Sequence, residues 1–182
     1  NADAFLAKYS QCFTSYYTDI ITVCNSYTWT NGITYTGNNS SQSITGVGFQ
    51  SDFGWWKRRN TAADHSLIDS VRGVTKHLVS NTTGAEQTAS AGTELVSFDT
   101  DGFTLGAKAD VNVNGDTYAS WNWKANGTGS ANTDGSINTI ATSVNTTSGF
   151  SIVKWAGTNA QATIGHGLGV APSLIIVKKN AP

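Results

Sequence analysis

The sequence reads Gly46-Val-Gly48-Phe-Gln-Ser-Asp-Phe53-Gly-Trp-Trp-Lys57 in its first third, and a similar stretch with the same two glycines and lysine returns near the end of the chain. The second copy, 121 residues later, reads Gly167-Leu-Gly169-Val-Ala-Pro-Ser-Leu174-Ile-Ile-Val-Lys178. Upstream of the first stretch, residues 33–39 are similar to residues 153–159, at an offset of 120. The second copy therefore has one additional residue between its two matching segments. A domain-length period in a chain of 182 residues predicts tandem modules.

The repeat divides the chain into three expected parts. Residues 1–26 form an N-terminal arm or connector, residues 27–149 form one β-sandwich module, and residues 150–182 start a second, truncated copy. In both copies two glycines precede an apolar run. This predicts a tight turn that requires glycine, because a phosphate-binding fingerprint would follow a strand and open a helix. Leu174–Val177 is predicted to be a buried strand, and we expect residues 150–182 to pair with strands of the same or an adjacent module, since the strand edge would otherwise be bare.

The composition favours short strands joined by tight turns. Gly, Asn, Ser and Thr dominate, and only two prolines occur. Strands are predicted from alternation or apolar runs at residues 33–36, 64–73, 75–79, 94–98, 102–105, 110–114, 118–123 and 150–155. Turn signals separate them at Asn31-Gly32, Asp101-Gly102, Asn114-Gly115 and Ser148-Gly149. The predicted fold is all-β, an antiparallel β-sandwich or jelly roll.

The charge and hydropathy of the chain exclude two classes of partner. Only 13% of the residues are charged and the net charge is -1, so no basic surface is available for nucleic acid. No apolar run reaches the roughly 18 residues that a spanning helix requires, so membrane insertion is not expected. The sequence contains no methionine, so we do not expect residue 1 to be a translation start.

The N-terminal arm differs from the rest of the chain. Ala2–Val23 carries apolar residues at helical spacing, which predicts a helix, although β-branched threonines weaken that prediction. Cys12 and Cys24 are the only cysteines. On one helix they would lie about 18 Å apart, so a disulfide and a continuous helix exclude each other, and both alternatives stay open.

The candidate catalytic and metal-binding groups are weak. His65 lies between Asp64 and Asp69 and near Ser66, but no nucleophile elbow surrounds it, and a structural ion pair is the favoured use of Asp69. Asp110–Asp116 resembles the first half of a calcium loop, but Trp121 stands where a bidentate Glu is required, so a hairpin is preferred. A weaker calcium site that combines Asp99, Asp101 and Asp116 across neighbouring turns remains as an alternative. No other cofactor is expected.

Aromatic side chains are the candidates for binding glycans, because sugar rings stack on exposed indoles. Core packing is the favoured role of Trp121 and Trp123. Trp56 precedes a basic run at a strand end and is the best exposed candidate, with Asn39 and Asn81 as polar partners for sugar hydroxyls.

The order of several motifs resembles a repeat module of virion-associated proteins in marine tailed phages. The motifs are Asp64–Gly73, Ser97–Gly106, Asn114–Tyr118, Trp121–Ala125 and Ile164–Lys178. The resemblance implies a lectin-like, concanavalin-type sandwich in a tail fibre or surface appendage. It also implies self-association in a homo-oligomeric fibre, commonly a trimer, beside other virion proteins. It implies no catalytic residue.

We therefore expect a non-enzymatic structural component of a phage virion, located at the particle surface or tail and contributing to attachment to a host surface glycan. An alternative is a secreted, extracellular bacterial adhesin or carbohydrate-binding module. A second alternative is a glycan-degrading tailspike. That enzyme would need two carboxylates facing each other about 5 to 9.5 Å apart, for which Asp99, Asp101 and Asp116 are the only plausible supply.

Overall fold

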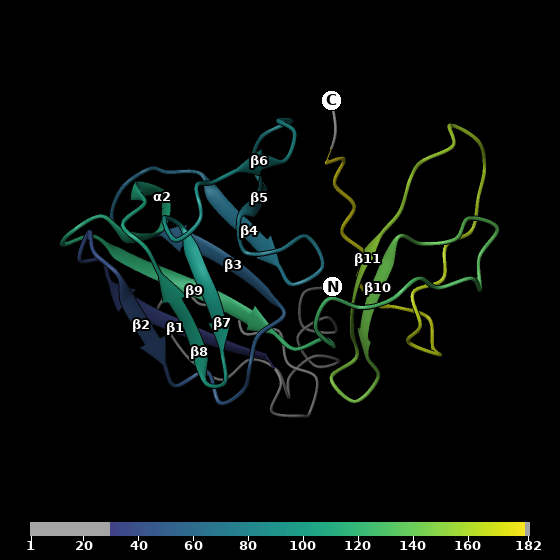
Figure 1. Ribbon diagram of the computed structural model, residues 1–182, viewed down its shortest axis with the longest axis horizontal. Helices are drawn as coiled ribbons and strands as arrows, with labels where there is room; N and C mark the ends of the chain where they lie inside the picture. Colours follow the sequence, from purple (N-terminus) through teal and green to yellow (C-terminus); the bar gives the residue numbers. More distant parts are fainter. Residues whose placement is uncertain (1–29, 181–182) are drawn as a thin grey trace, which may run out of the picture.

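The computed structural model describes residues 30–180, and these form an all-β sandwich of antiparallel strands (Figure 1). One layer is a six-stranded sheet in the order β1-β9-β3-β4-β5-β6. Its strands are β1 (Thr30–Thr36), β3 (Phe53–Arg58), β4 (His65–Asp69), β5 (Lys76–Val79), β6 (Gln87–Thr88) and β9 (Thr117–Trp123). The fold class predicted from alternation and turn signals is confirmed. The predicted arm at residues 1–26, with Cys12 and Cys24, lies outside the described residues.

The second layer is a three-stranded sheet in the order β2-β8-β7. It consists of β2 (Gln42–Thr45), β7 (Leu95–Asp99) and β8 (Gly102–Leu105), and the single-turn helix α2 (Ala109–Asn112) follows it. A separate hairpin of β10 (Ala141–Asn145) and β11 (Phe150–Lys154) stands beside the sandwich (Figure 1).

The core lies between the two layers and is centred on Trp56. Alternate residues of β3 point to opposite faces, so Gly54 and Trp56 are buried while Phe53 and Trp55 are half-buried on the outer face. The indole of Trp56 is 1% exposed and meets Phe103 of β8 edge-on, with ring centroids 5.3 Å apart. Burying side chains of this size provides the main free energy that holds the two sheets together.

The β10–β11 hairpin packs on the outer face of the large sheet. The ring of Phe150 stacks on Trp123 at 5.9 Å and contacts Phe53 at 5.8 Å. Ser148 Oγ also donates to the carbonyl of Lys124 at 2.7 Å. The predicted boundary between residues 149 and 150 therefore falls at the turn of this hairpin, and β11 pairs with β10 from the preceding part of the chain.

Two local predictions were wrong. Residues 110–114 were predicted as a strand, but α2 forms there. The Asn112 side chain is completely buried and donates to the carbonyls of Ser40 (2.6 Å) and Gly106 (2.7 Å), and these tertiary hydrogen bonds override the strand-like alternation. Asn31-Gly32 was predicted as a turn, but both residues lie within β1, where the Asn31 side chain donates to the carbonyl of Val47.

The repeat is visible in the backbone as well as in the sequence. β11 begins at residue 150, which corresponds to residue 30 at the start of β1. Asn39 and Asn159 are the two non-glycine residues with positive φ in the described chain, at 53° and 57°. Gly46 and Gly48 have φ of 93° and 85°, and Gly167 and Gly169 have φ of 73° and 74°, so the predicted glycine turn is present in both copies.

The second copy departs from the first at Leu174–Val177. These residues form no strand, and their exposed fractions are 66 to 70%. The prediction of a buried strand was therefore wrong for the described chain. The same residues in the first copy form β3, which pairs with β9 on one edge and β4 on the other.

Asp52 connects the large sheet to the chain that leads into the hairpin. Its carboxylate accepts hydrogen bonds from the amides of Ala125 (2.8 Å) and Gly127 (3.0 Å), and the side chain is 7% exposed. Asp52→Ala should lower the free energy of unfolding by about 1 to 3 kcal/mol, because two amides lose their acceptor. Urea titration would measure this, with exposed Asp134→Ala as the control. If neither substitution changed the free energy of unfolding, the stabilising role of the Asp52 hydrogen bonds would be contradicted.

Candidate functional site

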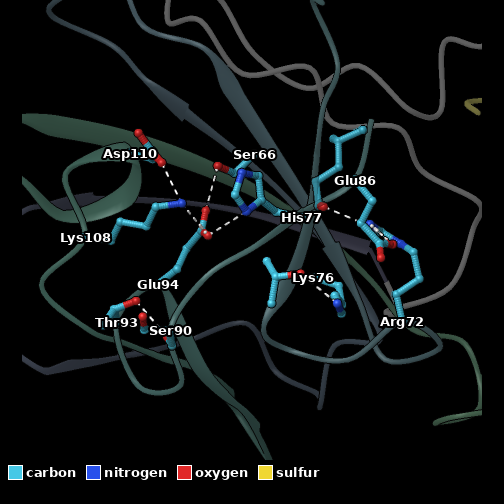
Figure 2. Close-up of polar contacts among 12 residues, drawn as sticks. Ser66, Arg72, Lys76, His77, Glu86, Ser90, Thr93, Glu94, Lys108 and Asp110 are labelled. Atoms are coloured by element: carbon cyan, nitrogen blue, oxygen red, sulfur yellow. Dashed lines mark hydrogen bonds and ion pairs between the residues drawn. The ribbon is translucent and has the colours of Figure 1, made fainter. Parts of the chain in front are cut away.

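A buried polar cluster brings together Ser66, His77, Glu94 and Lys108 (Figure 2). Its centre is Glu94, which is 1% exposed and directly precedes β7. The Glu94 carboxylate accepts from Ser66 Oγ of β4 at 3.0 Å and from Lys108 Nζ at 2.9 Å. Nδ1 of His77, from β5, lies 2.9 Å from Glu94 Oε2. We call these four residues the Glu94 cluster.

The cluster places opposite charges close together in a poorly solvated position. Burial alone would raise the pKa of the Glu94 carboxyl, but its close contacts with His77 and Lys108, at 2.9 Å each, outweigh burial and hold the pKa below its ordinary value. Burial would lower the pKa of Lys108, but Asp110 and Glu94 raise it overall. Glu94 and Lys108 therefore form an ion pair at neutral pH that links β7 to the chain before α2.

The geometry of the Glu94 cluster differs from that of a nucleophilic triad. Ser66 is 4% exposed, and its hydroxyl hydrogen bond goes to a carboxylate, whereas an activated serine is hydrogen-bonded to an imidazole that takes its proton. The sequence suggests His65 as a base near Ser66. In β4 these adjacent residues point to opposite faces of the sheet, so they do not form such a pair.

His77, Glu94 and Asp110 are also the group of residues best placed to hold a metal ion in the described chain, with ligand atoms within 4.8 Å of one another. The ammonium group of Lys108 lies 2.9 Å from Glu94 and 2.8 Å from Asp110. It therefore already supplies a positive charge to both carboxylates. No local sequence pattern indicates this cluster, because its members come from four separate segments.

The predicted calcium ligands are each engaged elsewhere, and the described structure does not gather them into one metal-binding group. Asp101 accepts from the amides of Gly46 and Gly48, so it holds the repeated glycine turn. Asp99 accepts from Ser97 and Thr104 at 2.6 and 2.7 Å. The hydrogen bond from Asn60, together with the Arg58 guanidinium, holds the pKa of Asp116 below its ordinary value.

The predicted glycan-binding residues do not form one surface site. The proposal that Trp56 is exposed was wrong, because its indole lies in the core. Asn39 is exposed and adopts the left-handed conformation of the repeated turn. Asn81 is exposed too, but it donates to Asp64 at 2.7 Å and accepts from the amide of His65. Its contacts tie the loop after β5 to the start of β4.

The outer face of the large sheet carries an aromatic group that includes Trp121, for which core packing was the favoured role. Trp55 and Trp121 are half-buried cross-strand partners, with ring centroids 6.1 Å apart. Trp55 Nε1 donates to His65 Nδ1 at 3.0 Å. Burial and the nearby Lys57 charge lower the pKa of His65, which favours the neutral imidazole that accepts this bond. The available signal was the alternation of β3, which places Trp55 and Trp56 on opposite faces.

Acidification should weaken the sandwich through Glu94. A carboxyl whose pKa is lower in the folded than in the unfolded chain stabilises the fold fully above its unfolded value, near 4.5. This stabilisation is lost as the pH falls through the folded pKa. The difference in free energy of unfolding between wild type and Glu94→Gln should therefore be largest at neutral pH and shrink below about pH 4.5. Urea titrations of both proteins from pH 7 to 3 measure this difference in the free energy of unfolding. A difference that does not change with pH would contradict the ion pair.

Across residues 30–180, no helix has the length and apolarity needed to cross a bilayer. A sequence family described as "Domain of unknown function (DUF7483)" matches residues 25–182. No curated protein and no solved structure matches the chain.

Proposed function

The chain belongs to the DUF7483 family, and we propose that it is a non-enzymatic structural component of a phage virion, in a tail fibre or surface appendage. The observation that carries this proposal is the repeat, in which one turn conformation occurs twice within the described chain, at residues 39–48 and 159–169. Rigid β modules in series suit an extended appendage, because each module contacts only its neighbours. The motif order that resembles virion proteins of marine tailed phages supports the same function.

The proposed mechanism of attachment is avidity. A rigid module presented in many copies on a homo-oligomeric fibre binds a surface with high overall affinity even when each contact is weak. The reason is that the effective concentration of the other copies rises once one copy has bound. The buried charges in the Glu94 cluster contribute to this rigidity by joining strands of both layers. No step in this function requires bond making or breaking by the protein.

The direct test is quantitative mass spectrometry of purified tailed-phage particles whose genome encodes this sequence. We expect peptides from residues 30–180 in several copies per particle, with a copy number that matches the symmetry of the fibre. Detection only in the soluble fraction of the lysate would contradict the proposal. Immunogold labelling with an antibody against the folded chain would then place the protein at the tail or at another part of the surface.

A carbohydrate-binding module or secreted adhesin is the second candidate, and the outer aromatic face favours it. Trp55, Trp121 and His65 present two indoles and an imidazole on one face of a sheet. Indole rings stack on the apolar faces of sugars. The test is glycan-array binding by the multimerised chain, compared with Trp55→Ala and with exposed Asp134→Ala as the control. Binding that Trp55→Ala abolishes, in a protein absent from particles, would support this candidate over the first.

A further inference from the structure

The segment Leu174–Lys178 has no partner in the described structure that explains its sequence. Four consecutive apolar side chains at residues 174–177 are 66 to 70% exposed. The end of the segment is anchored by polar groups, with Lys178 Nζ donating to the carbonyl of Thr82 at 2.8 Å and Asn180 accepting from the amide of Glu86. An exposed apolar run of this kind usually marks an interaction surface.

The first copy of the repeat shows what an equivalent segment pairs with. Residues 53–57 correspond to residues 174–178 and lie in β3, in the middle of the large sheet. β3 pairs antiparallel with β9 along one edge and with β4 along the other. Before residue 174, β11, Asn159 and the turn at Gly167 and Gly169 match the first copy, although residues 163–166, which correspond to β2, form only an isolated bridge at Ile164. We propose that Leu174–Lys178 is the central strand of a second sandwich, covered by a β4-like and a β9-like strand from a second module of the same kind.

The side chains of the two copies are complementary in volume. In the first copy a Cβ at Gly54 would overlap the six-membered ring of Trp56, so the indole occupies the space above the glycine. The second copy has Ile175 and Val177 at these two inward positions. Two medium-sized side chains therefore take the places of a glycine and a tryptophan, and the total volume stays similar. Cores tolerate changes that conserve volume.

A double-mutant cycle in the first module tests this exchange. Gly54→Ile alone should destabilise strongly because the new side chain overlaps Trp56, and Trp56→Val alone should destabilise by leaving a cavity. The double variant should have a higher melting temperature than the sum of the two single effects predicts. Additive losses would overturn the proposal, because the second copy's side chains would then not suit the position of β3.

The second test supplies strands equivalent to β4 and β9 in the same chain. Residues 58–149 are attached directly after Lys178, so that Lys178 takes the position of Lys57. In this extended chain the amides of residues 174–178 should exchange with deuterium about 100-fold more slowly than in the 182-residue chain, because hydrogen-bonded core strands open only through large unfolding events. Unchanged exchange in a folded extended chain would overturn the proposal.

Paired variants of the extended chain test the direction of the strand. Ile175→Lys with Val177→Lys places charges at inward positions and should abolish the added protection. Leu174→Lys with Ile176→Lys changes the outward positions and should remove much less of it. Equal losses would indicate nonspecific apolar contact. Protection that appears in the 182-residue chain only at high concentration would assign the segment to contact between chains and would overturn the proposal as well.

If the extended chain does not fold, the double-mutant cycle alone tests the proposal that Leu174–Lys178 is equivalent to β3. The inference concerns the repeat and does not depend on the location of the protein in a phage. If the protein were absent from phage particles, the expected results of these two tests would stay the same. If both tests failed, the particle measurement would still test the proposed function.

Discussion

Trp56→Ala should lower the free energy of unfolding by about 3 to 5 kcal/mol, the range expected when a large aromatic side chain is removed from a packed core. The indole is 1% exposed and meets Phe103 of the opposite sheet edge-on. Its removal would therefore leave a cavity between the two layers. Thermal and urea unfolding of the purified chain, followed by circular dichroism, would measure the loss.

Two matched variants separate the core from the outer face. Trp56→Phe keeps an aromatic ring and removes an indole N–H that has no hydrogen-bond partner among residues 30–180, so it should destabilise much less than alanine. Trp55→Ala removes the neighbouring, half-buried indole from the outer face and should also have a smaller effect. If Trp56→Ala left stability unchanged while Trp55→Ala unfolded the chain, the facing of β3 would be reversed.

Glu94→Gln should lower the free energy of unfolding at pH 7 by about 3 kcal/mol, because the charge-assisted contacts of the buried carboxylate with Ser66, His77 and Lys108 are weakened, although Asp110 still pairs with Lys108. Glu94 holds Ser66, His77 and Lys108 together, and these residues belong to separate segments of the sandwich. The same substitution at Glu86, which lies 3.4 Å from Arg72 and is more exposed, serves as the control. Equal effects at both positions would show that the buried cluster has no special role in stability.

Much of the strand content could be predicted from alternation and turn residues. The runs at residues 64–73, 75–79, 94–98, 102–105 and 118–123 overlap β4, β5, β7, β8 and β9, with β7 ending one residue later and β9 beginning one residue earlier than predicted. Local sequence was sufficient there because period-two alternation and the flanking turns indicate the same structure. At residues 110–114 it was not, because Asn112 forms hydrogen bonds with residues far away in sequence.

The facing of individual side chains could not be predicted in the same way. Alternation places Trp55 and Trp56 on opposite faces but does not say which face meets the second sheet. That choice is made by Phe103 and the other core residues of β7 and β8. The proximity of Trp56 to a basic run therefore misled the search for an exposed indole.

The candidate site was harder to predict than the fold. Glu94, His77 and Lys108 carry no spacing motif, and their contacts arise only when β5 faces the start of β7 across the core. The acids that did attract attention, Asp99 and Asp101, have a different role. They bind hydroxyl and amide groups near the β7–β8 turn, a common use of aspartate beside tight turns.

The central claim is that one local structure occurs twice in this chain. Solution NMR of the 182-residue protein tests it most directly, because backbone chemical shifts and the intensity of the intraresidue amide-to-Hα nuclear Overhauser effect report the sign of φ. We expect Asn39 and Asn159 both to have positive φ, with Gly167 and Gly169 matching Gly46 and Gly48. An extended conformation at Asn159, with Asn39 left-handed, would contradict the claim that residues 150–182 repeat the first module.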